Sequence, residues 1–191
     1  MMRLTRVAKP FDDPDYIFEL KHDGFRAIAY IENSKCELVS RNQNHFSFKS
    51  LRESLGKLPV QNAILDGEVV CLDEHGISQF NELFSRNGRQ VFYAFDLLFL
   101  DGHDLRGLPL FERKQRLHQL IEKSLFTRII YAQYIEGQGK VFFKEICARD
   151  LEGIVAKRKL GIYKSNGTGW LKIKNPNYSQ AVGRHGLLKS R

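Results

Sequence analysis

Apolar and polar residues alternate along much of the chain, which is the pattern of β-strands with one buried face. The run between residues 91 and 100 is the most apolar, and turn-forming pairs bound it, so it is predicted to be a central strand. Residues 32–35 are predicted to form a hairpin turn. The predicted strands cover residues 16–22, 25–32, 36–42, 63–73, 91–100, 128–135, 152–158 and 169–175.

Apolar residues recur at helical spacing in four other segments. In the first of these, Phe48, Leu51 and Leu55 share one face, and Pro59 follows its end. Ser78 is predicted to be the N-cap of the second. The predicted helices cover residues 46–58, 78–86, 110–124 and 140–150. Helices do not alternate regularly with strands, so the pattern favours an α+β fold over a doubly wound parallel sheet.

The composition is typical of one sizeable domain. The chain has 191 residues, of which 42% are hydrophobic, and this is enough to bury a core. We expect a domain over residues 1–176 and a basic tail over residues 177–191. The net charge of +8 favours an anionic partner, although basic domains without nucleic acid are also common.

The cysteines and the apolar runs indicate the cellular compartment in which the protein is expected to work. Cys36, Cys71 and Cys147 are widely spaced and form neither a disulfide framework nor a C-x-x-C metal motif. They are expected to pack in the core of a protein in a reducing, cytoplasmic compartment. No apolar run has the length of a signal peptide core or a membrane span, so no membrane partner is expected.

The stretch KHDGFR, residues 21–26, places charges between two apolar strands. A lysine in a strand is most often a solvated edge charge. Lys21 would nevertheless be a covalent nucleophile if its amine were deprotonated. Gly24 permits a turn or a close approach of the backbone to a ligand, and Arg26 offers a planar fork for phosphate or hydroxyl groups. The stretch is therefore consistent with either an amphipathic strand or a nucleophile with its positioning residues.

Three later strands also carry charges opposite an apolar face. Asp66 and Glu68 lie in one strand, Glu152 begins another, and Lys172 and Lys174 share a face of the last. Each pattern alone is ordinary for an amphipathic strand. Together they supply carboxylates for a divalent metal and cations for phosphates, which are the groups that nucleotidyl transfer requires. Neither a Walker-type loop nor a G-x-G-x-x-G loop is present, so a nucleotide would be bound in another way.

In sequence and in order, the segments KHDGFR, SRN, LDGE, FYAFDLL, EGIVAKR and WLKIK resemble the motifs of ATP-dependent DNA ligases, members of the covalent nucleotidyltransferase superfamily. The resemblance spans residues 18–176, and the spellings DGFRA, AFDLLFLDG and EGIVAKR look most like the bacterial end-joining branch. It implies two antiparallel β-sheets flanked by helices around a central nucleotide pocket, a ligase-type, ATP-grasp-like fold.

The resemblance also implies a reaction. With ATP and Mg²⁺ or Mn²⁺, Lys21 would form a covalent lysyl-AMP, and the AMP would pass to the 5′-phosphate of nicked double-stranded DNA for phosphodiester formation in DNA repair. The implied contacts are Glu19 with the adenine amino edge, Arg26 with the ribose, Arg41 with the nucleotide or the nick phosphate, Glu68 with the ribose or the metal, Phe95 and Val155 with the two adenine faces, Glu152 with the metal, and Lys172 and Lys174 with the α-phosphate, where they would stabilise charge during transfer.

The sequence departs from full ligases of this superfamily in one respect. Such ligases carry an OB-fold after the last strand motif, and no OB-fold is expected here after residue 176. The chain would then seal nicks weakly, act with an OB-fold or DNA-repair protein in trans, or be the core of a longer protein. The alternatives are an RNA ligase or capping-type nucleotidyltransferase, and a non-catalytic nucleotide- or DNA-binding module.

Overall fold

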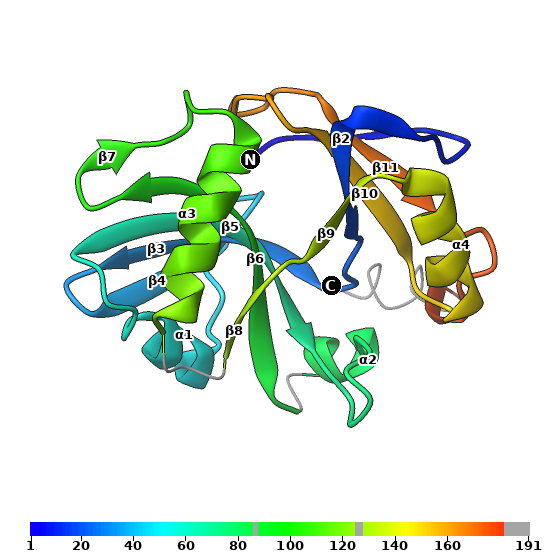
Figure 1. Cartoon of the computed structure of the whole chain (residues 1–191). Helices are drawn as coiled ribbons and strands as arrows, with labels where there is room; N and C mark the ends of the chain where they lie inside the picture. Colours follow the sequence, from blue (N-terminus) through cyan, green and yellow to red (C-terminus); the bar gives the residue numbers. More distant parts are fainter. Residues whose placement is uncertain (86–87, 125–127, 182–191) are drawn as a thin grey trace.

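The computed structural model describes residues 1–85, 88–124 and 128–181, which form two β-sheets with helices packed against them (Figure 1). The first sheet has the order β1 (Leu4–Arg6), β11 (Trp170–Lys174), β10 (Gly153–Arg158), β2 (Asp13–Leu20) and β9 (Tyr134–Gly137). The second has the order β4 (Lys35–Ser40), β3 (Phe25–Glu32), β5 (Asn62–Cys71), β6 (Gln90–Leu100) and β7 (His103–Asp104), with β8 (Ile129–Tyr131) also paired to β6.

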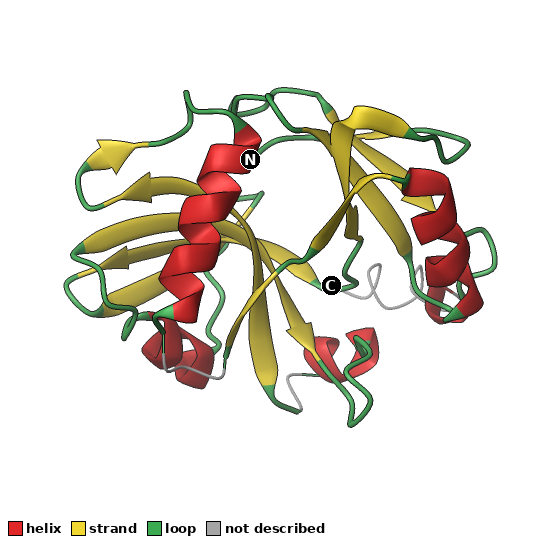
Figure 2. Ribbon diagram, viewed as in Figure 1, coloured by secondary structure: helices red, strands yellow, loops and turns green. Residues whose placement is uncertain are grey.

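Figure 2 shows the two sheets on opposite sides of the molecule, with the strands far outnumbering the helical segments. Neighbouring strands are antiparallel, except that β1 is parallel to β11 and β8 is parallel to β6. The predicted α+β class with two sheets is confirmed. The predicted central strand is also confirmed, because β6 pairs with β5, β7 and β8.

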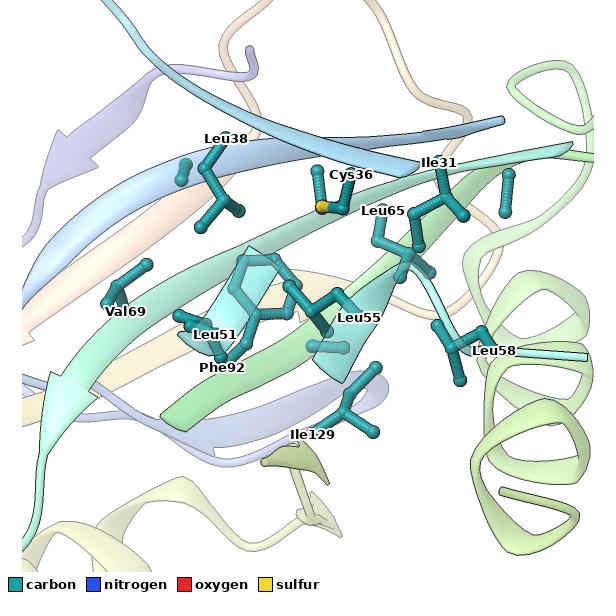
Figure 3. Packing of buried hydrophobic residues seen from close by; sticks show 14 of the residues in the cluster. Ile31, Cys36, Leu38, Leu51, Leu55, Leu58, Leu65, Val69, Phe92 and Ile129 are labelled. Atoms are coloured by element: carbon teal, nitrogen blue, oxygen red, sulfur yellow. The ribbon is translucent and has the colours of Figure 1, made fainter. Parts of the chain in front are cut away.

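The larger apolar core lies between the second sheet and the helices α1 (Lys49–Leu55) and α3 (Leu110–Glu122). Leu51 and Leu55 of α1 pack beside Leu65 of β5 and Phe92 of β6 (Figure 3). Ile31 points from β3 into the same cluster. Burial of these side chains is the main force that fixes α1 against the sheet, at about 1.5–3 kcal/mol for each large apolar residue.

The first sheet has its own core beneath α4 (Gly139–Ala148). Ile154 and Ala156 of β10 pack there with Ile146 of α4, whereas Val155 between them packs in a separate cluster on the opposite face of the sheet. That second cluster also contains Trp170 of β11. Because side chains alternate along a strand, the face opposite α4 is left to line the space between the sheets.

A buried ion pair fastens α3 to β6. Arg113 donates from Nε to Asp96 Oδ1 at 2.7 Å and from Nη2 to Asp96 Oδ2 at 2.8 Å. Its Nη1 donates to the carbonyl oxygens of Leu108 and Gly161. The side chains of Arg113 and Asp96 are 1% and 0% exposed, so water cannot replace either partner.

Replacing Arg113 with leucine is expected to lower the free energy of unfolding by about 3–5 kcal/mol, because Asp96 is left buried without its counter-ion. Urea unfolding at neutral pH measures this loss. Arg106→Leu is the matched control, since its pair with Asp104 is about half exposed to water, at 51% and 49%. Equal losses in the two variants would contradict the prediction.

Two predicted elements differ in the structure. The single strand predicted over residues 128–135 is wrong, because β8 pairs with β6 in the second sheet and β9 pairs with β2 in the first. The chain crosses between the sheets at this point. Ser78 is also not an N-cap: α2 (Phe80–Phe84) is preceded by Gln79 without a side-chain cap, and Ser78 forms an isolated bridge with Leu72.

The chain after β11 returns to the connection between β2 and β3. Tyr178 is buried, and its hydroxyl donates to Asp23 Oδ2 at 2.8 Å. The short 3-10 helix η1 (Ser179–Ala181) follows. Residues 182–191 of the predicted tail lie outside the described residues, and the domain boundary at residue 176 stays a prediction. No helix among the described residues has the length and apolar character needed to cross a membrane.

Candidate active site

A pocket between the two sheets is lined by residues of both. Six of the residues that the sequence assigns to the site line it: Glu19, Lys21, Arg26, Glu68, Phe95 and Val155. The other four, Arg41, Glu152, Lys172 and Lys174, are not part of this lining but lie near Lys21, as their ion pairs and charge interactions show. The structure therefore gathers all ten residues in one region.

Lys21 lies where the chain passes from the first sheet to the second. The strand predicted to continue through His22 ends at Leu20, so Lys21 belongs to the connection between β2 and β3. Its backbone N–H donates to Gly153 O at 2.9 Å, and its ammonium donates to Glu152 Oε2 at 2.7 Å. A side chain 18% exposed thus reaches the pocket from an anchored backbone.

Gly24 packs closely against the second sheet, and the close approach to a ligand expected at this position stays a prediction. A Cβ at this position would lie 2.1 Å from the carbonyl oxygen of Val69 in β5. Any side chain would push the connection that carries Lys21 away from the second sheet. Gly24 therefore lets the connection that carries the candidate nucleophile pack directly against β5.

Three lysines gather around Glu152, and Arg41 lies within charge range of one of them, Lys172. The second oxygen of Glu152, Oε1, lies 3.3 Å from the ammonium of Lys174. Lys172 is half-buried, and its pKa is lowered by burial and then by the charges of Lys174, Lys21 and Arg41. Among the described residues, the Lys172 side chain makes neither a hydrogen bond nor an ion pair. Such a surplus of positive charge is suited to a polyphosphate.

Glu68 and Glu152 are the two carboxylates that the sequence assigns to a metal, and both interact with Lys21. Burial raises the pKa of Glu68 to about 7; Lys21 and Arg26 oppose this shift, and Glu152 adds to it. Two carboxylates, completed by substrate phosphate oxygens and water, match the usual donor set of Mg²⁺. The described residues contain no group of three or more His, Cys, Asp or Glu side chains that could bind a metal unaided.

Arg26 is already engaged by the protein. It donates from Nε and Nη2 to the two oxygens of Asp66 at 3.0 and 2.7 Å, and from Nη1 to Met2 O at 2.7 Å. Tyr163 donates to the same carboxylate at 2.7 Å. The guanidinium also lies over the Trp170 ring, 5.0 Å from its centroid. Asp66 thus orients Arg26 within the pocket wall, and any ribose contact would use its remaining N–H groups.

The aromatic and aliphatic residues predicted to hold a base both lie in the pocket lining. Phe95 comes from β6 of the second sheet and Val155 from β10 of the first. Trp170, which the sequence analysis did not single out, meets Phe95 edge to face with ring centroids 5.7 Å apart. A flat apolar ligand would therefore find a wall from each sheet.

Glu19 lies beneath the pocket between two lysines. Lys114 Nζ donates to Oε1 at 2.5 Å, and Lys157 Nζ lies 2.5 Å from Oε2. Burial alone would raise the pKa of Glu19, but the two ammonium groups outweigh burial and lower it. Neither lysine was predicted from the sequence to be a partner of Glu19. The sequence does contain a pattern that indicates a buried role for Lys114. Lys114 and Arg113 occupy the apolar stripe of α3 together with Leu110 and Leu117.

His22 stacks on Tyr93 of β6, with ring centroids 3.7 Å apart. Burial lowers the pKa of His22 from 6.5 to about 4. Between these two pH values the unfolded chain binds a proton at His22 and the folded protein does not. Stability is therefore lost as the pH falls through this window.

In His22→Phe, which keeps the stacking ring without a titrating group, the stability lost between pH 7 and pH 5 is expected to be about 2 kcal/mol smaller than in the wild type. Urea unfolding at both pH values measures the difference. His75→Phe, at an exposed position, controls for replacing a histidine elsewhere. An identical acid-dependent loss in wild type and His22→Phe would show that His22 does not carry the effect.

In sequence, the chain is similar to DNA ligases. The family model described as "ATP dependent DNA ligase domain" matches residues 2–174. The multifunctional non-homologous end joining protein LigD of Pseudomonas aeruginosa is 32% identical over 168 residues, which is 84% of this chain and 20% of that protein. The SPbeta prophage-derived DNA ligase-like protein LigB of Bacillus subtilis is 29% identical over 189 residues, which is 95% of this chain and 69% of that protein.

Two solved structures resemble the fold. The ligase domain of M. tuberculosis LigD has a TM-score of 0.80 and 28% identity, and the match covers 91% of this chain and 58% of that one. A mycobacterial DNA ligase D complexed with ATP and MES has a TM-score of 0.78 and 29% identity, with 91% and 59% covered. The present chain thus spans little more than half of these ligase structures.

Proposed function

The chain belongs to the family of ATP-dependent DNA ligase domains, and on this basis we propose that Lys21 carries a covalent AMP during catalysis. The deprotonated Nζ attacks the α-phosphorus of ATP, and a nitrogen–phosphorus bond forms. The bond to the bridging oxygen breaks, pyrophosphate leaves with that electron pair, and the lysine protons pass to solvent. The position of Lys21 at a pocket between two sheets, beside Glu152 at 2.7 Å, is the observation that supports this assignment.

The pocket residues have roles that follow from their chemistry. Phe95 and Val155 would hold the adenine between the sheets, because a ring face stabilises a stacked base by about 1–3 kcal/mol. Arg26 would contact the ribose, and Glu68 would contact either the ribose or the metal. Arg41, Lys172 and Lys174 would contact the phosphates.

A divalent cation is proposed as a cofactor. Glu152 and Glu68 would hold Mg²⁺ or Mn²⁺, which when bound neutralises charge on the phosphates. Glu152 also accepts a hydrogen bond from Lys21 at 2.7 Å, so the carboxylate that would hold the metal lies beside the proposed nucleophile. The two-carboxylate donor set supports this proposal.

Nicked double-stranded DNA is the proposed acceptor. An oxygen of the 5′-phosphate would attack the AMP phosphorus and release Lys21, and the 3′-hydroxyl would then attack the 5′-phosphate and displace AMP. An OB-fold or a DNA-repair protein in trans is the proposed partner for these later steps. Cys36 and Cys147, which form no disulfide among the described residues, together with a DNA substrate, support a cytoplasmic location.

Intact-protein mass spectrometry after incubation with ATP and Mg²⁺ tests the proposal. A mass gain of one AMP that EDTA prevents is the expected result. A gain of GMP from GTP in its place would favour a capping-type enzyme. No covalent gain on protein free of bound AMP, despite measurable ATP binding, would contradict the proposed chemistry for this chain and favour a binding module; repeating the assay with an OB-fold in trans shows whether that domain restores the step.

A further inference from the structure

Lys114 is a buried lysine that lies outside every segment assigned to the reaction. Its side chain is 1% exposed, and it comes from α3 of the outer layer. Its ammonium donates to Glu19 Oε1 at 2.5 Å and to the carbonyl oxygen of Ala132 at 3.0 Å, and it lies 4.6 Å from the centroid of the Tyr131 ring. These contacts give Lys114 one fixed position, from which it orients the carboxylate of Glu19.

Lys157 approaches the other oxygen of Glu19 and also lies over the rings of Phe95 and Trp170, 4.3 and 3.9 Å from their centroids. Its ammonium lies 2.5 Å from Oε2, but it has no hydrogen bond of acceptable geometry among the described residues. Lys114, by contrast, donates both to Glu19 and to a backbone carbonyl oxygen, so it is the better directed of the two lysines.

The protonation state of Glu19 decides which purine base it can bind. An ionised carboxylate can only accept hydrogen bonds, whereas a protonated carboxyl can also donate one. Adenine carries an amino donor at position 6, and guanine carries a carbonyl acceptor there. An ionised Glu19 therefore attracts adenine and repels guanine, and a protonated one loses that distinction.

We propose that Lys114 is a positioning residue for base selection, which holds Glu19 as a fixed hydrogen-bond acceptor and so makes the pocket prefer ATP over GTP. The inference rests on the proposed function, in which Glu19 faces the amino edge of the adenine. It adds a residue of α3 that touches no substrate and acts through Glu19.

Equilibrium binding of ATP and of GTP, measured by calorimetry, tests the inference. All variants carry Lys21→Ala, so binding is read without covalent trapping. Lys114→Met is expected to lower the ratio of ATP affinity to GTP affinity by at least about tenfold, because buried polar groups left without their partners lose discrimination. Lys123→Met, the same change at an exposed position of the same helix region, is expected to keep the ratio.

A second variant keeps the test decisive if Lys114→Met does not fold. Glu19→Gln with Lys114→Met removes the buried carboxylate together with its counter-ion, and the glutamine amide can both donate and accept. This pair is also expected to lose the preference for ATP. An unchanged ratio in either folded variant, with both affinities lowered equally, would overturn the inference and leave Lys114 a purely structural role. Equal affinity of the Lys21→Ala parent for ATP and GTP would overturn it too.

A different observation would contradict the proposed function. If protein with Lys21 intact gains no AMP from ATP, the covalent chemistry is contradicted, yet the ratio of the two affinities still decides the role of Lys114. If AMP is gained and the ratio does not respond to Lys114, only the base-selection inference is lost.

Discussion

Replacing Lys21 with alanine is expected to lower the rate of covalent AMP labelling by at least about a thousandfold, since the attacking nitrogen is removed. Lys21 Nζ lies at the pocket and beside Glu152, where the α-phosphate and a metal are proposed to meet it. A time course of intact-protein mass spectrometry with ATP and Mg²⁺ measures the rate. The free energy of unfolding, measured in parallel, shows whether the variant remains folded.

Two control variants separate the loss of the nucleophile from loss of charge. Lys21→Arg retains a cation beside Glu152 but offers no nucleophilic amine at neutral pH, so it is expected to remain folded and unlabelled. Lys140→Ala, at an exposed position on α4, is expected to be labelled at the wild-type rate. Labelling that survives in Lys21→Ala and disappears in Lys157→Met would place the nucleophile on Lys157, which also lines the pocket.

Replacing Lys172 with methionine is expected to slow AMP labelling by about a hundredfold or more, the loss typical for a group that stabilises charge developing in the transition state. Lys172 is half-buried and has no ion-pair partner among the described residues, and Lys174, Lys21 and Arg41 surround it with like charge. A phosphate would relieve that repulsion, most strongly when negative charge builds up on the leaving pyrophosphate. Labelling rates at several ATP concentrations measure the effect.

The division between rate and affinity identifies the role of Lys172. We expect the limiting rate at saturating ATP to fall more than the apparent affinity for ATP, because the contact strengthens in the transition state. Lys164→Met, at an exposed position of the loop before β11, is the matched control. A variant that loses affinity alone, with an unchanged limiting rate, would show that Lys172 only binds ATP.

The alternation of apolar and polar residues was enough to predict which side chains share a face of each strand. In β10, Val155 faces the pocket and its neighbours Ile154 and Ala156 face the core under α4, as the alternation requires. The hairpin at residues 32–35 was also correctly predicted, because Asn33 and Ser34 adopt the positive φ values that such turns need. These features depend only on residues close together in the chain.

Local pattern failed where the chain changes sheets. Residues 128–135 have the alternation of one strand, but Ala132 donates its backbone N–H to Ala94 O in the second sheet and the chain then joins the first. β2 likewise ends at Leu20 because the connection through Lys21 must reach the second sheet. Side-chain alternation does not show which sheet a strand joins, so these breaks were not visible in the sequence.

The sequence by itself determined which residue types reach the pocket and that the chain carries the ordered motifs of a ligase domain. Only the tertiary structure decided how those residues are held: Arg26 by Asp66, and Glu19 by Lys114. The two cations on the apolar stripe of α3 indicate that buried acceptors lie opposite, but Lys114 and Glu19 are 95 positions apart in the chain. A buried charge must find its counter-ion wherever the fold brings one within reach, and that choice depends on packing and not on neighbours in sequence.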